Sequence, residues 1–182
     1  SMAKFTVEYP ASFMLVASMN PCPCGYHNHP DKECVCTPGT VQKYLNRISG
    51  PLLDRIDIHI EVVPVSFSRL SEHNEAEKST NIRERVVRAR EIQERRFEAH
   101  KNIHNNAQMH SRMIRSHCHI DAAGQAILKN AMERLGLSAR AYDRILKVSR
   151  TIADLDNAEN IGAEHLAEAI QYRSLDRDNW AE

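Results

Sequence analysis

Four cysteines in the amino-terminal part of the chain have the type and spacing needed to hold a metal ion. They form two Cys-x-Cys pairs, Cys22 with Cys24 and Cys34 with Cys36, separated by nine residues. Thiolates are strong zinc ligands, and four of them complete a tetrahedral structural site that leaves no open position for catalysis. The spacing therefore predicts a structural zinc site in the loop 20–36.

Other states of these thiols are open at this point. Free or redox-active thiols are the main alternative, and His27 or His29 inside the loop can replace one cysteine as a ligand. A disulfide within a Cys-x-Cys pair is a tight fit, and disulfides are rare in a reducing cytoplasm. The fifth cysteine, Cys118, lies between His117 and His119. There we expect a packed thiol rather than a second metal site.

Arg55 is the next residue with the means to act on a ligand, because a guanidinium binds phosphate or carboxylate groups through a fixed fork of donors. The run 56–62 after it alternates apolar and polar residues, which is typical of a half-buried strand. Ser-Gly-Pro at 49–51 predicts a break before that strand. We therefore expect Arg55 at a strand edge, reaching outward. The alternative is a surface arginine paired with Asp54 or Asp57.

The elements that position these residues follow an α/β order in the first third of the chain. Residues 13–18 predict a strand, and the loop 20–36, rich in Cys, Pro and Gly, follows it. Pro38, preceded by a threonine N-cap, is a suitable start for a helix that reaches Ile48. The strand at 56–62 completes this part.

Beyond a polar linker, the pattern is helical to the end of the chain. A loose capping box at 81–84, N-caps at Asp121 and Ser138, a terminating Gly136, and Gly162 before the last helix mark the boundaries. Two helices have clear inward-facing stripes, with Ile82, Val86, Ala89 and Phe97 on the first, and Tyr142, Ile145, Leu146, Ser149 and Ile152 on the second.

The overall charge is balanced and excludes a strongly basic or acidic binding protein. The 182 residues include 24 basic and 24 acidic side chains, so no net field draws the protein to nucleic acid or membrane. No apolar run approaches the roughly 20 residues that cross a bilayer, and no secretory leader precedes Lys4. We expect a cytoplasmic protein with no membrane partner. Residues 81–115 carry nine Lys/Arg against four Glu, which is either a solvated face or a DNA-contacting one.

Four longer runs stand out in the sequence, at residues 19–25, 47–57, 136–142 and 164–176. Together and in this order they resemble the magnesium-chelatase-like family of AAA+ ATPases over nearly the whole chain. The resemblance implies the carboxyl-terminal part of an AAA+ P-loop ATPase domain. That part holds the last strands of the α/β nucleotide-binding core, followed by an all-α helical lid, and is mostly helical.

The residues and the resemblance together divide the chain. Ser1, Met2 and Ala3 look like the remnant of a cleaved tag, and we expect the rest to be an excised piece of a longer protein. The expected parts are a tag remnant at 1–3, the end of the AAA+ core at 4–64, a linker at 65–80, the helical lid at 81–176 and a tail at 177–182.

The resemblance also implies roles for three residues. Asn20 matches sensor 1, which orients the attacking water or contacts the γ-phosphate of ATP bound with Mg²⁺. Arg55 matches the arginine finger, which is supplied to the ATP of a neighbouring subunit in a homo-oligomeric ring, here a hexamer. Arg140 matches sensor 2, acting in cis or in trans. Without the resemblance, Asn20 is a turn residue and Arg140 part of a solvated helix face.

The chain by itself lacks the motifs that bind and hydrolyse ATP. Its six glycines never show the Gly-x-x-x-x-Gly-Lys-Ser/Thr spacing of Walker A, and no apolar strand ends in the Asp-Glu of Walker B. We expect no ATPase activity from this chain alone. For the longer parent the resemblance implies an ATP-dependent helicase that drives DNA branch migration in recombination and natural transformation. The alternatives are a chelatase motor for metal insertion into a porphyrin and a non-enzymatic, zinc-stapled interaction module.

Overall fold

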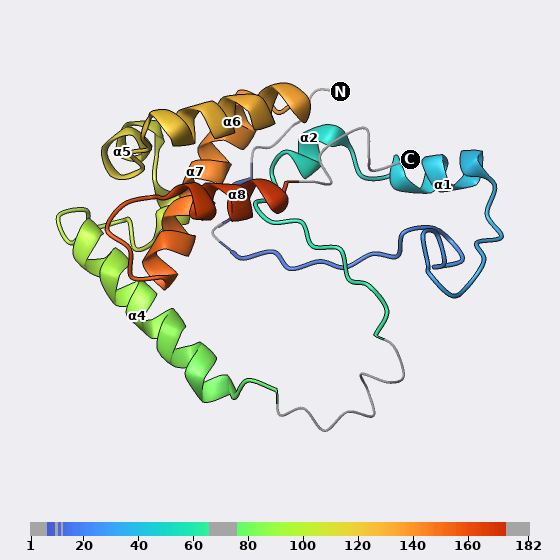
Figure 1. Cartoon of the computed structure of the whole chain (residues 1–182), viewed down its shortest axis with the longest axis horizontal. Coiled ribbons are helices and arrows are strands. Elements are labelled where there is room, and N and C mark those ends of the chain that lie inside the picture. The colour runs from blue at the N-terminus through green and yellow to red at the C-terminus, as the bar shows by residue number, and fades with distance from the viewer. Residues whose placement is uncertain (1–6, 10, 12, 66–75, 174–182) are drawn as a thin grey trace.

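The computed structural model describes residues 7–9, 11, 13–65 and 76–173. Within these ranges lie seven α-helices and one 3-10 helix: α1 (Pro38–Leu45), α2 (Gly50–Leu53), α4 (Ser79–Phe97), η1 (Asn106–Gln108), α5 (Ser111–His117), α6 (Ala122–Arg134), α7 (Ala139–Leu155) and α8 (Ala163–Gln171). Helices α4 to α8 gather into one body, and the Cys loop with α1 lies at the other end of the molecule (Figure 1). None of the described helices has the length and apolar character to span a membrane.

Helix α7 is the centre of the helical body. It packs against α8, α4, α5 and η1, while α6 packs against α8. The stripe predicted on α7 is confirmed at Ile145, Leu146, Ser149 and Ile152, all of which are buried. It is wrong at Tyr142, in the first turn of α7, whose side chain is 40% exposed. The largest buried apolar side chains around α7 are Phe97, Leu128, Ile145 and Leu166.

Local capping sets several helix boundaries where the sequence predicts them. Thr37, Asp121 and Ser138 each accept, with a side-chain oxygen, a hydrogen bond from the amide three residues further on, at 3.4, 2.7 and 3.3 Å. Such bonds satisfy amides that have no partner inside the helix. Gly136 has a φ of 56° and ends α6 in the left-handed conformation that glycine adopts without strain. Helix α1 is shorter than expected, since it ends at Leu45 rather than Ile48.

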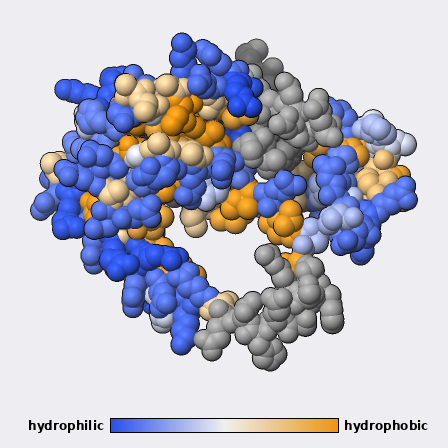
Figure 2. Space-filling view, viewed as in Figure 1, coloured by the Kyte–Doolittle hydropathy of each residue, from blue (hydrophilic) through white to orange (hydrophobic). Residues whose placement is uncertain are grey.

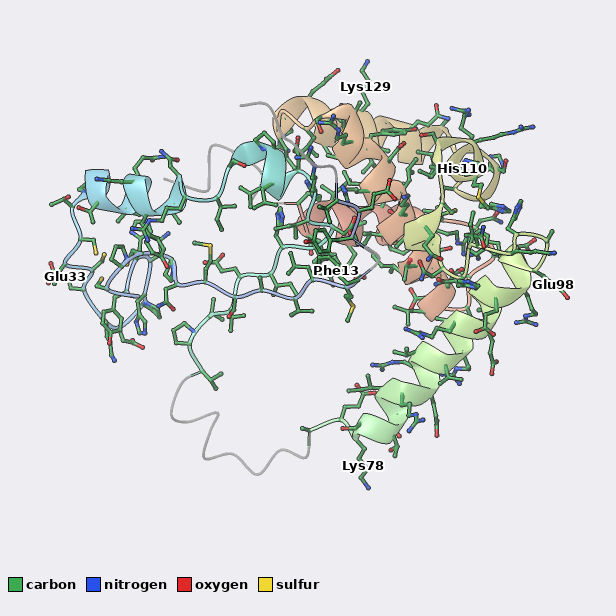
Figure 3. All side chains as sticks on the ribbon, turned by 180° about the vertical axis from the view of Figure 1, so that it is seen from behind. Phe13, Glu33, Lys78, Glu98, His110 and Lys129 are labelled. Atoms are coloured by element: carbon green, nitrogen blue, oxygen red, sulfur yellow. The ribbon has the colours of Figure 1, made fainter. Side chains whose placement is uncertain are left out.

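The predicted start of α4 is wrong. The helix begins at Ser79 after Lys78, without a side-chain cap, so the capping-box residues 81–84 lie inside it. Its stripe is only half buried: Ala89 and Phe97 are covered, whereas Ile82 and Val86 are 43% and 42% exposed. The reason is tertiary, because α4 runs outward from the body toward its Lys78 end, away from Glu98 (Figure 3).

The strands predicted at 13–18 and 56–62 do not form. No β-strand occurs in the part of the chain that the structure describes, and both segments run as extended traces (Figure 1). A strand-like pattern, alternating at 56–62 and nearly continuously apolar at 13–18, becomes a strand only when a neighbour supplies ladder hydrogen bonds, and among the described residues neither segment is part of a ladder. Their apolar side chains stay on the surface, as Figure 2 shows between the helical body and the Cys loop; Val16 is 82% and Val62 87% exposed. The α/β part of the fold is therefore not confirmed, whereas the mostly helical character is.

A buried charged network joins α4, η1 and α7. The carboxylate of Asp154 is fully buried and accepts hydrogen bonds from Arg96 at 2.7 Å, Arg150 at 3.1 Å and Asn106 at 2.8 Å. Arg150 also donates to the carbonyls of Ala158 and Glu159 beyond the end of α7. The network satisfies charges that would otherwise be costly to bury.

The predicted division of the chain stays a prediction. The tag remnant at 1–3, the tail at 177–182 and most of the linker at 65–80 lie outside the described residues. Helix α4 begins two residues before the expected start of the lid at 81.

Candidate functional site

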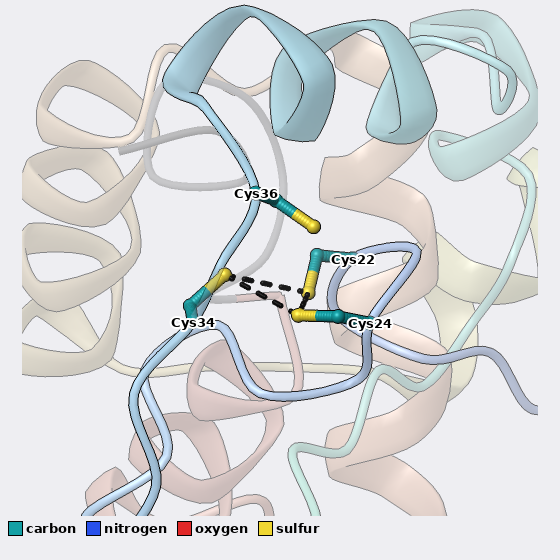
Figure 4. A group of neighbouring side chains, drawn as sticks. All are labelled: Cys22, Cys24, Cys34 and Cys36. Atoms are coloured by element: carbon teal, nitrogen blue, oxygen red, sulfur yellow. Dashed lines mark hydrogen bonds between the residues drawn. The ribbon is translucent and has the colours of Figure 1, made fainter.

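The four cysteines predicted as metal ligands converge on one point (Figure 4). Their sulfur atoms all lie within 4.8 Å of one another. The Sγ atom of Cys22 is 3.3 Å from that of Cys24 and 3.7 Å from that of Cys34, and Cys24 and Cys34 are 3.6 Å apart. A tetrahedron with zinc–sulfur bonds of about 2.3 Å has sulfur–sulfur edges of about 3.8 Å, so the cluster has the dimensions for a metal ion.

Local backbone structure brings the two Cys-x-Cys pairs together. Gly25 has a φ of 84°, and its amide donates to the carbonyl of Cys22 at 3.0 Å, which closes a tight turn around the first pair. The second pair runs directly into the N-cap of α1. Cys22 is fully buried and forms a small core with Val41 and Leu45 on that helix. The loop and α1 thus make one small unit around the thiols.

The four thiols differ in how easily they lose a proton. The backbone amide of Tyr26 stabilises the thiolate of Cys24 and lowers its pKa to about 6. The backbone amide of Cys36 favours the thiolate of Cys34, but burial and the neighbouring thiols Cys24 and Cys22 outweigh it and raise the pKa of Cys34 to about 12. The pKa of Cys36 is also raised. One negative charge therefore suppresses the next, and a divalent cation would remove that repulsion.

The alternatives for these thiols can be compared with the geometry. All five cysteines are free of disulfides. The cluster among the described residues contains no histidine; the Nδ1 atom of His29 instead accepts a hydrogen bond from the amide of Asp31 at 3.0 Å. Cys118 is buried in the helical core, where desolvation raises its pKa to about 11. It is a packed thiol, as the sequence predicts.

Arg55 follows the short helix α2 (Gly50–Leu53). It does not lie at the edge of a strand, because the strand predicted at 56–62 does not form. The break predicted at Gly50 and Pro51 is confirmed, since α1 ends at Leu45, and the two residues form the first turn of the separate short helix α2, where proline is well tolerated. The side chain of Arg55 is exposed, and its Nη1 atom donates to the carbonyl of Pro51 at 2.6 Å. The carboxylate of Asp57 pairs with Arg144 on α7 and not with Arg55. Arg55 is therefore exposed on the surface, with its guanidinium held by a carbonyl of the preceding helix α2.

The other two predicted site residues lie on different elements. Arg140 is exposed in the first turn of α7, one helical turn before Arg144. Asn20 is exposed at the start of the Cys loop, with its side chain against Gly25. The structure links the elements of Arg55 and Arg140 through the Asp57–Arg144 ion pair. Asn20 instead belongs to the unit around the cysteines.

One feature of this region has no signal in the sequence pattern. Arg173, at the end of α8, is fully buried, and its Nη1 atom donates to the carbonyl of Ile56. Three residues after Ile56, the amide of His59 donates to the carbonyl of Tyr172 at 2.9 Å. Arg173 lies inside one of the four longer runs, but periodicity does not distinguish a buried arginine from an exposed one. Only its position against residues 56–59 identifies it.

Comparisons with known proteins place this geometry in context. The family described as magnesium chelatase, subunit ChlI C-terminal, matches residues 76–173, and the family described as magnesium chelatase, subunit ChlI, matches residues 1–70. Competence protein ComM of Haemophilus influenzae is 43% identical over 178 residues, which cover 97% of this chain and 34% of that protein.

Further relatives agree with these matches. The uncharacterized protein YifB of Salmonella typhimurium is 40% identical over 178 residues, again 97% of this chain and 34% of the relative. An uncharacterized protein of Mycobacterium tuberculosis is 34% identical over 165 residues, 91% of this chain and 32% of the relative. The chain thus spans about a third of the length of the relatives it matches.

Proposed function

The chain belongs to the magnesium chelatase ChlI family, and from this premise we propose that it is the carboxyl-terminal part of an AAA+ ATPase motor. In this proposal residues 4–64 complete the nucleotide-binding core, and residues 81–176 form the lid beyond the linker 65–80. The observation that carries it is the pair of separate family matches, at 1–70 and 76–173, which agrees with this division.

The two extended segments support this view. Segment 13–18 is a nearly continuous apolar run and segment 56–62 alternates as a strand does; within the described residues neither has a ladder partner, and both expose apolar residues that a larger sheet would cover. The relatives are about three times as long as this chain, which leaves room for the remaining strands and the Walker motifs in a longer parent. ATP with Mg²⁺ is then the cofactor of that parent.

Within this motor we assign three roles. Asn20 is sensor 1 at the γ-phosphate. Arg55 is the arginine finger, because its exposed guanidinium can reach the ATP of a neighbouring subunit and stabilise charge on the transferring phosphoryl group. Arg140 is sensor 2, on the exposed face of α7. In this proposal Arg55 contacts nucleotide from the core, and Arg140 contacts nucleotide from the lid.

DNA is the proposed substrate of the parent protein. In this proposal the parent is a cytoplasmic hexameric ring that drives branch migration. One relative is named a competence protein, which favours a role in natural transformation. Exposed arginines on the outer half of α4, including Arg83, Arg85 and Arg88, could contribute contacts to phosphates. The family description favours a second candidate, a chelatase motor that drives metal insertion into a porphyrin.

We further propose that the cysteine cluster holds structural zinc. The four thiols have the spacing of a closed tetrahedral site, and they sit beside a core too small to be stable alone. When bound, the ion would supply charge neutralisation and a cross-link between the loop and α1. In that role it stabilises the loop that carries Asn20.

The experiment that tests the motor compares variants of the full-length protein that contains this chain. We expect Arg55→Ala to lower kcat for ATP hydrolysis by about 10³-fold or more, and Arg55→Lys to restore little, because the lysine lacks the planar fork. The matched control is Arg134→Ala, an exposed arginine on α6. Normal ATP hydrolysis by the Arg55→Ala protein would remove Arg55 from its role.

The same full-length protein and its Arg55→Ala variant decide which substrate the motor acts on. ATP-dependent unwinding of branched DNA, lost in Arg55→Ala, favours the DNA motor. Dependence of ATP hydrolysis on a porphyrin-binding partner favours the chelatase motor. A full-length protein that hydrolyses no ATP under either condition would leave the zinc-stapled interaction module as the explanation.

A further inference from the structure

We propose that Asp57, Arg144 and Arg173 form a clamp that fastens the segment carrying Arg55 to the helices of the lid, so that Arg55 and Arg140 move as one unit. The roles of the two arginines in nucleotide chemistry rest on the proposed function above. The clamp itself is a property of this chain and can be measured without ATP.

Three contacts act on nearly consecutive residues of one segment. The buried guanidinium of Arg173 donates to the carbonyl of Ile56. The carboxylate of Asp57 pairs with Arg144. The amide of His59 donates to the carbonyl of Tyr172 at 2.9 Å. Each contact joins residues 56–59 to a partner more than 80 positions away, so they fix tertiary position rather than local conformation.

The burial of Arg173 is the strongest indication that this contact is specific. A guanidinium is rarely removed from water entirely, because its desolvation is costly unless polar groups receive it. Here Arg173 is 0% exposed and directs one of its nitrogens to a main-chain carbonyl of the segment. His59 is also buried, at 8% exposure, beside the end of α8. The segment is thus anchored to the lid through His59 and the carbonyl of Ile56, while its apolar side chains Ile58 and Ile60 stay exposed.

The ion pair between Asp57 and Arg144 fixes how the segment is placed against α7. Arg144 is 26% exposed and Asp57 51% exposed, so by itself the pair contributes little to stability. Its value is geometric. Arg144 lies one turn after Arg140 on the same face of α7, and Asp57 lies two residues after Arg55. A shift of α7 is therefore transmitted through the ion pair to Asp57, two residues after Arg55.

This arrangement gives a physical route between two nucleotide sites. If Arg140 responds to ATP at the lid, α7 moves, and the clamp carries residues 56–59 with it. Arg55 then changes its approach to the neighbouring subunit. Asp57, Arg144 and Arg173 are positioning residues in this scheme, since they act on Arg55 and do not touch the nucleotide.

The first test uses this chain and follows hydrogen exchange of the His59 amide by NMR. We expect Asp57→Ala and Arg144→Ala each to speed its exchange about two- to fivefold, the range for loss of a partly exposed ion pair. The double charge reversal, Asp57→Arg with Arg144→Asp, should return exchange toward the original rate. Arg173→Lys keeps the charge, loses the fork, and should give a larger increase.

The control for this test is another exposed ion pair, Lys129 with Glu133, whose atoms are 3.9 Å apart within α6. Lys129→Ala removes a cation without touching the segment and should leave the His59 amide unchanged. Unaltered exchange in both Asp57→Ala and Arg144→Ala, or failure of the charge reversal to restore it, would overturn the clamp.

The second test asks whether the clamp positions Arg55 in the full-length protein. We expect Arg144→Ala to lower kcat for ATP hydrolysis while KM for ATP stays the same, and the charge reversal to recover kcat. Faster hydrogen exchange of the His59 amide together with an unchanged kcat would overturn the positioning role. If Arg55→Ala itself leaves hydrolysis intact, the finger assignment fails, and the clamp is still decided by the amide measurement.

Discussion

Cys24 and Cys118 carry the same thiol group, but their surroundings shift its pKa in opposite directions. The amide of Tyr26 stabilises the Cys24 thiolate, and the pKa is about 6. Burial disfavours the Cys118 thiolate, and the pKa rises from its ordinary value of 9.0 to about 11. Because Cys118 is more acidic in the unfolded chain, its stabilising contribution is complete below pH 9 and is lost as the pH rises through about 11.

These values predict the order in which the thiols react. In metal-free, reduced protein at pH 7, iodoacetamide should alkylate Cys24 first, because the thiolate is the nucleophile. Cys34, with a pKa of about 12, should react much later, and Cys118 only on unfolding. Peptide mass spectrometry over time measures this order. Added zinc should suppress alkylation of Cys24, and equal rates for Cys24 and Cys118 in the folded protein would contradict the assignment.

Asp154 is the residue on which the charged network of the helical body depends. Asp154→Ala leaves Arg150 and Arg96 without their buried counter-ion, so we expect a loss of about 3–5 kcal/mol in the free energy of unfolding. Urea denaturation followed by circular dichroism measures it. Glu133→Ala, which removes an exposed carboxylate on α6, should cost less than about 1 kcal/mol. Comparable losses in the two variants would show that the network is not critical.

At the scale of elements, the helical body depends on how closely its helices approach. Gly124 in the first turn of α6 faces α8, and a Cβ atom placed there would lie only 2.8 Å from the Cδ1 atom of Leu166. With glycine at this position, α6 approaches α8 without displacing the Cδ1 methyl group of Leu166. Leu166 is fully buried at this contact. The pattern of the sequence does not reveal this role, because Gly124 reads simply as a weak helix former.

Gly124→Ala tests the contact between α6 and α8. We expect it to lower the free energy of unfolding by about 1–3 kcal/mol, since overpacking outweighs the better helix propensity of alanine. The matched control is Gly39→Ala in α1, where no atom lies within 4 Å of the added Cβ. That variant should be neutral or slightly stabilising, by up to about 1 kcal/mol. A stabilised Gly124→Ala protein would mean that α8 can retreat at no cost.

At the scale of the whole molecule, the described residues form two cores of unequal size. The larger lies among α4 to α8, and the smaller consists of Cys22, Val41 and Leu45, with the other three cysteines of the cluster and Tyr44 around them. So small an apolar cluster cannot hold a loop by burial alone. Its stability should therefore depend on the metal, while that of the helical body should not.

Metal removal separates the two cores. After treatment with a chelator, we expect amides of α1 to lose their protection against hydrogen exchange, while those around Ile145 on α7 keep theirs. Hydrogen exchange mass spectrometry on both regions makes the comparison in one sample. Cys36→Ser should reproduce the effect of the chelator. Simultaneous loss of protection in α1 and α7 would show that the two cores unfold as one.

Features that depend on neighbouring residues could be derived from the sequence alone. The caps Thr37, Asp121 and Ser138, the terminating Gly136 and the clustering of four cysteines all appear where the pattern predicts them. Capping bonds and Cys-x-Cys turns close within a few residues, so the local sequence contains everything that they need. For the same reason the mostly helical character was predictable.

Only the tertiary structure decided the features that need a distant partner. The segment 56–62 has the alternation of a strand, but ladder partners are absent among the described residues, and Arg173 and Tyr172 bind its backbone instead. The partner of Asp57 is Arg144 and not its neighbour Arg55. Sequence by itself determined the helix starts that are capped by Thr37, Asp121 and Ser138 and which thiols converge, because those interactions are local. Pairing and burial across the chain were set by packing, which brings together residues that no spacing rule connects.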